Sequence, residues 1–236
     1  MRVPHQEASS RRCIRLAARL FCLRITVTLM DSSVMGVLLC VLVFCLGVLS
    51  MGLQLLASRV LAPFFGNSIF VWASLITTFL AAFSTGSFVG AAASSRWVGT
   101  QSKFMIGITA VGSGWLLLDA VGSYAICDWF DLAIDNLPAK LITVCVLLYF
   151  IPVATFSALT PICVGSYDRT WQSAGRSAGI LNGISTLGNI VGVLVTALLL
   201  IPTFGIRHLL HCWWISSVLI QFLLWFVLYS PCSRER

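Results

Sequence analysis

The sequence has few charged residues. Of its 236 residues, 10% are Asp, Glu, Lys or Arg, whereas 58% are hydrophobic, and the mean hydropathy is +0.96. Soluble domains carry about 25% charged residues, so this composition excludes an ordinary soluble globular protein. It indicates an integral membrane protein, with the lipid bilayer as its surroundings.

The sequence also lacks the short motifs by which common enzymes hold nucleotides, metals or nucleophiles. It has no P-loop, no GxGxxG after a strand, no HExxH and no GxSxG. Its nine cysteines form no CxxC pair, and several fall in or near apolar runs, where free cysteine acts as a small apolar residue. We therefore expect no enzymatic activity, no cofactor and no metal.

Six apolar runs are each long enough to cross a bilayer, for which a helix needs about 20 residues. Backbone polar groups in lipid must be satisfied within the segment, so every run is predicted to be a helix. With short connections, this predicts an all-α, six-helix membrane domain over residues 34–230. The runs are Val34–Ala57, Asn67–Gly90, Phe104–Ile126, Ala139–Thr160, Ser177–Ile201 and Ile206–Tyr229.

Basic residues are unequally distributed between the two ends of these runs. Of the 15 Lys and Arg residues, all but Arg59, Lys140 and Arg207 fall on the side of the chain termini. Because basic residues concentrate in cytoplasmic loops, we expect both termini in the cytoplasm and the protein in the cell (inner) membrane. The net charge of +7 then reports orientation rather than nucleic-acid binding.

Residues 1–33 form a basic head, and residues 231–236 a short basic tail. The head is rich in arginine and nearly free of acids, as in a helix lying on an anionic membrane face. The same features fit an organelle transit segment. A mis-assigned start, with Met30 or Met35 as the true first residue, is a further alternative.

Asp119 is the one clear acid within a predicted span, in the third run. Such acids are costly and usually face the protein interior or a substrate or proton path. The alternative is that Asp119 lies close enough to the outer boundary to be hydrated. We expect Arg59 to pair with an acid such as Asp119 or with helix carbonyls, the alternative being a snorkelling side chain.

Other polar residues suggest a cavity. Asn182, Thr186 and Asn189 in the fifth run are spaced by four and three residues, so they share one helix face. Gln54 lies late in the first run, and Trp72 begins the second at the boundary where tryptophan is common. These residues are candidate substrate contacts, and hydrogen bonding between helices is the alternative for the fifth-run cluster.

Glycines recur at helical spacing and predict close helix packing. They are Gly86 and Gly90 in the second run, and Gly175, Gly179, Gly183, Gly188 and Gly192 in or beside the fifth. Pro152 is expected to kink the fourth run and Pro161 to end it.

Three stretches together carry a family resemblance. "LASRVLAPFFGNSIFVWASLI", the "LTP" at Leu159–Pro161 and "AGRSAGILNGISTLGNIVGVLVTALLLIPTFGIR" resemble the membrane region of the fused transporter-like spermidine synthases. The similarity covers about Met51 to Arg207. In that family the spans precede an aminopropyltransferase-like domain, which this sequence does not contain. Gln54 and Ser95 stand where the family usually has acids.

The resemblance implies a polyamine-related membrane module and leaves three hypotheses open. The first is a six-helix unit similar to half of a major-facilitator transporter, which moves a small polar or cationic, polyamine-like solute as a homodimer or with a partner. The second is a non-transporting membrane anchor for a separately encoded aminopropyltransferase-like protein. The third is a truncated remnant without function.

Overall fold

The computed structural model describes residues 32–96, 101–133, 136–171 and 174–229, and all the regular structure in these ranges is helical. Six helical segments are long and apolar enough to cross a membrane. The predicted all-α, six-helix bundle is therefore confirmed. The predicted basic tail and nearly all of the predicted head lie outside the described residues.

The helices follow one another along the chain with short turns. The first three spans are single helices, and the fourth and fifth are each interrupted by a π-helical turn. In chain order, the elements are α2 (Ser32–Phe65), α3 (Ile69–Arg96), α4 (Gln101–Ala133), α5 (Leu137–Cys145), η1 (Val146–Phe150), α6 (Ile151–Trp171), α7 (Ala174–Val195), η2 (Thr196–Leu200), α8 (Ile201–Thr203) and α9 (Ile206–Tyr229).

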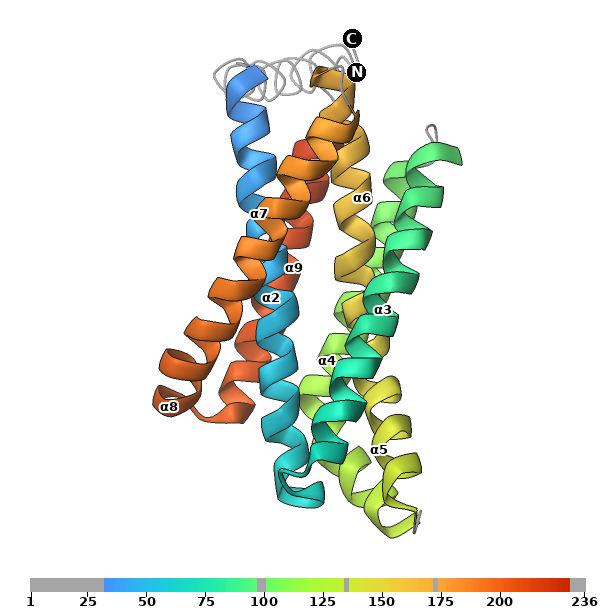
Figure 1. The fold of residues 1–236 in the computed structure, drawn as a ribbon, viewed down its shortest axis with the longest axis vertical. Coiled ribbons are helices and arrows are strands. Elements are labelled where there is room, and N and C mark those ends of the chain that lie inside the picture. The colour runs from blue at the N-terminus through green and yellow to red at the C-terminus, as the bar shows by residue number, and fades with distance from the viewer. Residues whose placement is uncertain (1–31, 97–100, 134–135, 172–173, 230–236) are drawn as a thin grey trace, which may run out of the picture.

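Two tightly packed helix pairs form the front of the bundle. Helix α2 packs along α7, and α3 packs along α6, as Figure 1 shows for the left and right halves of the molecule. Helices α4 and α9 contact each other and complete the bundle. The turns that follow α2 and α8, and the start of α5, lie at the lower end in Figure 1.

The first span is longer than the sequence predicts. Its helix continues beyond Ala57 to Phe65, so Arg59 and Pro63 lie inside it rather than in a loop. The helix ends at Gly66, whose positive φ of 70° and whose amide bond to the Ala62 carbonyl (3.0 Å) form the C-terminal turn. An arginine does not end an apolar helix at the boundary, because its long side chain can reach the interface from within it.

The two π-helical turns have the same sequence context. Each is followed directly by Ile-Pro, at Pro152 and at Pro202. A proline cannot donate the next helical hydrogen bond, and its ring clashes with the carbonyl four residues earlier. Widening the preceding turn gives that carbonyl room.

The prediction that Pro161 ends the fourth span is wrong. Pro161 lies inside α6, which continues to Trp171. Membrane helices tolerate an internal proline where neighbouring helices and hydroxyl side chains surround the freed carbonyl.

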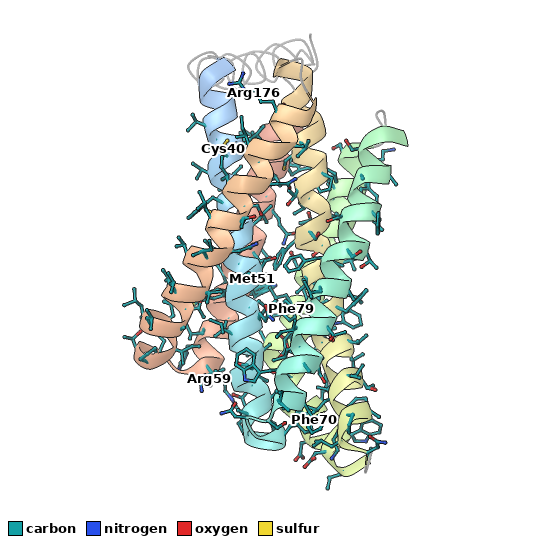
Figure 2. All side chains as sticks on the ribbon, in the orientation of Figure 1. Cys40, Met51, Arg59, Phe70, Phe79 and Arg176 are labelled. Carbon is teal, nitrogen blue, oxygen red and sulfur yellow. The ribbon has the colours of Figure 1, made fainter. Side chains whose placement is uncertain are left out.

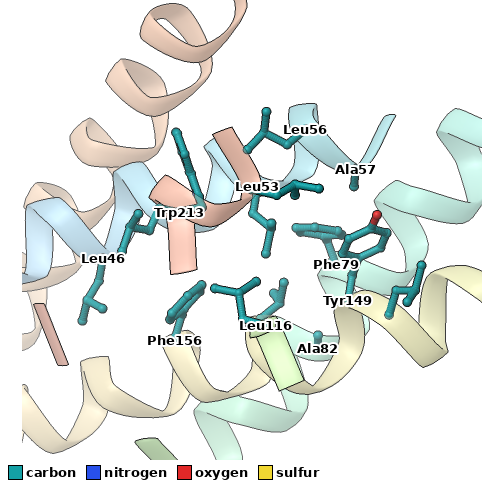
Figure 3. Packing of buried hydrophobic residues seen from close by; sticks show 14 of the residues in the cluster. Leu46, Leu53, Leu56, Ala57, Phe79, Ala82, Leu116, Tyr149, Phe156 and Trp213 are labelled. Atoms are coloured by element: carbon teal, nitrogen blue, oxygen red, sulfur yellow. The ribbon is translucent and has the colours of Figure 1, made fainter. Parts of the chain in front are cut away.

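The centre of the bundle is apolar. Figure 3 shows Leu53, Leu116 and Phe79 packed between Phe156 and Tyr149, and all five side chains are buried. At the edge of this layer, the indole Nε1 of Trp213 donates a hydrogen bond of 2.9 Å to the Leu49 carbonyl and so joins α9 to α2.

Candidate functional site

A polar cavity of about 290 Å³ lies between α2, α3, α6 and α7. Its apolar lining includes Leu46, Met51, Phe83 and Phe156. Among the described residues, no charged side chain lines it. The polar lining consists of hydroxyl and amide groups: Ser50, Ser87, Ser157, Thr160, Asn182, Ser185, Thr186 and Asn189.

Glycines allow the helices around this cavity to approach closely. A Cβ atom at Gly47 of α2 would collide with the Ser185 carbonyl of α7, and one at Gly188 or Gly192 would collide with the α2 carbonyls of Phe44 or Val48. Such small residues let two membrane helices touch backbone to backbone. The cavity is therefore held between rigidly packed helices rather than between loops.

Gly86 and Gly90 of α3 allow a similarly close approach between α3 and α6. Added Cβ atoms there would meet the Ala154 and Ala158 carbonyls of α6. In contrast, Cβ atoms added at Gly175, Gly179 and Gly183 would have no atom within 4 Å. This half of the fifth-span glycine pattern thus packs against nothing among the described residues.

Hydrogen bonds inside the cavity fix the direction of several hydroxyl groups. Ser157 donates to the Phe83 carbonyl at 2.7 Å, so the 2.8 Å contact between the two serine hydroxyls uses Ser87 as donor. Thr186 donates to the Asn182 carbonyl at 2.9 Å. Each hydroxyl has a single hydrogen, so these three groups have only acceptor lone pairs left for a solute.

The Asn189 side chain adds a further acceptor. Its Oδ1 atom is buried and has no hydrogen-bond partner among the described residues. Buried polar oxygens usually have a partner, and an unpaired one in a cavity wall marks a place where a ligand or water can bind. The cavity therefore offers acceptors to a solute that carries N–H or O–H donors, beside the amide N–H groups of Asn182 and Asn189.

The sequence-predicted substrate contacts separate into two groups. Asn182, Thr186 and Asn189 line the cavity together, as their shared helix face suggests. Gln54, Arg59, Trp72 and Asp119 are absent from its lining.

Arg59 and Trp72 lie on the outside of the bundle. Arg59 is exposed, near the lower end of α2 in Figure 2, and Trp72 is 37% exposed at the start of α3. Asp119, in contrast, is 1% exposed, and neither of its carboxylate oxygens has a hydrogen-bond partner in the described part of the chain. The expected Arg59–Asp119 pair is therefore not formed, because one side chain faces outward while the other is buried.

Asp119 also lies further from the end of its helical segment than the sequence suggests. The third membrane-crossing segment extends from Ser102 to Ala133, which puts Asp119 near its middle rather than near its end. The Asp119 side chain is also buried inside the protein rather than exposed at the surface of the bundle.

The hydroxyl residues of the other cavity walls were not identified from the sequence. Ser50 and Ser87 come from α2 and α3, and Ser157 and Thr160 from α6. The spacing of three between Ser157 and Thr160 puts both on one face of α6, and this is the signal that could have found them. Ser50 and Ser87 have no such partner on their own helices among the cavity-lining residues. Only the pairing of α2 with α7 and of α3 with α6 brings them together.

Comparisons of the chain with protein-family models, with curated proteins and with solved structures found no match.

Proposed function

We propose that this polytopic membrane protein transports a small polar or cationic solute, and that the cavity between α2, α3, α6 and α7 binds it. The observation that carries this proposal is the polar lining of a cavity inside a bundle whose buried core is mostly apolar. Polar groups inside a membrane domain are costly, and where they converge on one cavity they commonly mark a solute path.

The size and chemistry of the cavity limit the solute. A volume of about 290 Å³ is at the lower end of the range for small-molecule sites. The hydroxyl hydrogens of Ser87, Ser157 and Thr186 are already used in hydrogen bonds, so these three groups offer acceptors, which suit an amine or a polyol. No charged side chain among the described residues lines the cavity to pair with an anion. With the resemblance to spermidine synthase-like membrane regions, this makes putrescine and spermidine the first solutes to test.

The proposal includes a second copy of the chain. Asn182 and Thr186 are exposed although they line the cavity, so the cavity is not closed by the described residues. A homodimer that covers α7 would enclose the solute between two bundles. Measuring the mass of the purified protein in detergent tests this part directly.

The proposal also places both termini on the cytoplasmic side of a cell membrane. The basic residues at the end that would face outward are few, and two of them are held by the protein. Lys140 pairs with Asp131, and Arg207 lies over the Tyr124 ring at 4.8 Å. Their roles are thus local, whereas the more numerous basic residues at the other end follow the positive-inside rule.

Uptake of labelled putrescine and spermidine into vesicles containing the purified protein tests the function. We expect Asn189→Leu to reduce uptake by about tenfold or more, because it removes the unpaired acceptor and fills the cavity. The matched control is Ile190→Leu, which changes an exposed neighbour on the same helix. Absence of uptake by the wild type, or equal uptake by Asn189→Leu, would refute the proposal for these solutes.

The anchor hypothesis predicts a different result from the same preparation. A protein that only anchors a synthase-like partner would show no uptake, and it would co-purify with a soluble aminopropyltransferase-like protein. The cavity variant would then leave that association unchanged, because the cavity is inside the bundle.

A further inference from the structure

A second polar site lies in the bundle, away from the cavity. It is formed by Asp119 and Ser123 of α4 and by Tyr149 of η1. All three side chains are at most 1% exposed, and none of their side-chain oxygens has a hydrogen-bond partner among the described residues. Residues 119 and 123 are four apart and therefore lie on one face of α4, and Asp119 lies within electrostatic range of the Tyr149 hydroxyl.

The site is separated from the solute cavity by apolar side chains. In Figure 3, Leu53, Leu116 and Phe79 lie between Tyr149 and the cavity-lining Phe156. A solute in the cavity would not touch Asp119. The carboxyl group consequently has no role in the direct binding of the proposed solute.

No cation in the described residues neutralises Asp119. Two titratable groups lie within electrostatic range of Asp119: Cys127, which is on the same helix, and Tyr149. Tyr124 and Cys145 lie within range of Tyr149. The apolar stretch of α3 that packs nearby contains no titratable residue, and α6 contributes a buried cysteine, Cys163. The basic groups on α2 and α9 are exposed and do not bond to it: Arg59, Arg207, His208 and His211.

An ionised carboxylate in this place would be very costly. Moving an unpaired charge from water into an apolar interior costs several kcal/mol even after the protein relaxes. A carboxylic acid avoids this cost by carrying a proton. The described part of the fold provides no counter-ion or hydrogen-bond donor that would favour the charged form.

We propose that Asp119 is a proton-binding site, which carries one proton in the conformation described here and releases it when the bundle rearranges to admit water. The reaction is the binding of one proton from water to the carboxylate to give the neutral acid, and its reversal. Tyr149 lies on a π-helical turn directly before Pro152, and such turns are frequent at functional sites and can change their hydrogen bonding. The turn is therefore the element that would rearrange.

This inference goes beyond the proposed function, because proton binding at Asp119 does not depend on the solute. If both hold, any coupling between solute movement and proton binding would have to pass through the apolar layer between the two sites. If the protein transports none of the solutes tested, the infrared measurement below still tests the proton site independently.

Infrared spectroscopy of the purified full chain tests the proposal, because a protonated carboxyl group absorbs separately from a carboxylate. At neutral pH we expect an acid band in the wild type that is lost in Asp119→Asn. The control Asp128→Asn, which changes an exposed acid on the same helix, should keep the band. Asp119→Glu should keep an acid band at a shifted position, which covers the case in which the asparagine variant fails to fold.

Two outcomes would overturn the proposal. One is a wild-type protein with no acid band at neutral pH, which would show that Asp119 is ionised, for example beside a bound alkali cation. The other is a band that is present in wild type and unchanged in both Asp119 variants.

Discussion

The indole Nε1 of Trp115 donates a 2.7 Å hydrogen bond to the backbone carbonyl of Leu147. Leu147 lies in the π-helical turn five residues before Pro152, which has no N–H to offer. Trp115 thus supplies from α4 the donor that the fourth span lacks. The bond joins two spans at the turn on which Tyr149 lies.

Trp115→Phe should therefore weaken the bundle by about 1 kcal/mol, since hydrogen bonds between membrane helices contribute about 0.6 kcal/mol on average and at most about 1.7. We expect a lower unfolding temperature of the protein in detergent. The control is Trp129→Phe, because Trp129 is 63% exposed and the structure gives its indole no hydrogen bond within the described residues. Equal unfolding temperatures for wild type and Trp115→Phe would contradict this role.

The two halves of the fifth-span glycine pattern should respond oppositely to alanine. In Gly188→Ala the new Cβ would meet the Phe44 carbonyl, a backbone atom that cannot move away cheaply. Overpacking of this kind costs about 1–3 kcal/mol. Gly179→Ala meets no atom within 4 Å and adds a better helix former, so it should be neutral or slightly stabilising in the same thermal unfolding assay.

The same glycines also test the proposed homodimer. If a second copy packs against the Gly175–Gly183 part of α7, Gly179→Ala would lower the fraction of the protein that has the mass of a dimer in detergent. The unfolding temperature of the monomer would stay unchanged. A loss of monomer stability instead would show that this face is covered within one chain.

Much of the fold follows from the sequence, because the length and hydropathy of a membrane span are local properties. The six helices and the disturbance at Pro152 were expected on these grounds. The wrong prediction, that Pro161 ends a helix, also came from a local rule. That rule leaves out the surrounding helices, which can support a proline within a span.

The candidate site was less predictable, because it depends on which helices pair. The spacing of Asn182, Thr186 and Asn189 identified one wall of the cavity from a single helix. The other walls come from serines and a threonine on three further helices, and their convergence depends on the α2–α7 and α3–α6 contacts. The separation of Asp119 from the cavity likewise depends on apolar side chains contributed by three different helices.

The Lys140–Asp131 pair should make a measurable but small contribution to stability. The two groups are 2.7 Å apart, and Lys140 is also 5.8 Å from the centre of the Phe65 ring. The Asp131 side chain is 43% exposed, so solvent screening limits the pair to about 1 kcal/mol. We expect Asp131→Asn to lower the unfolding temperature more than Asp128→Asn, and high salt to reduce the difference. Identical effects of the two substitutions would show that the pair contributes nothing.

Tyr149 offers a prediction in which the hydroxyl and the ring have separate effects. The ring is fully buried against Phe79, with ring centroids 6.1 Å apart, whereas the hydroxyl has no hydrogen-bond partner among the described residues. Tyr149→Phe should therefore leave the unfolding temperature unchanged or raise it, since it removes an unpaired buried polar group. Tyr149→Ala should destabilise the protein by about 3–5 kcal/mol, because it leaves a large cavity in the apolar layer.

The infrared acid band assigned to Asp119 should persist in Tyr149→Phe but shift, because the hydroxyl dipole within electrostatic range of Asp119 is gone. A strongly destabilised Tyr149→Phe would instead mean that the hydroxyl has a partner in the membrane-embedded protein, and the buried site would then not be the unpaired group of oxygens inferred above.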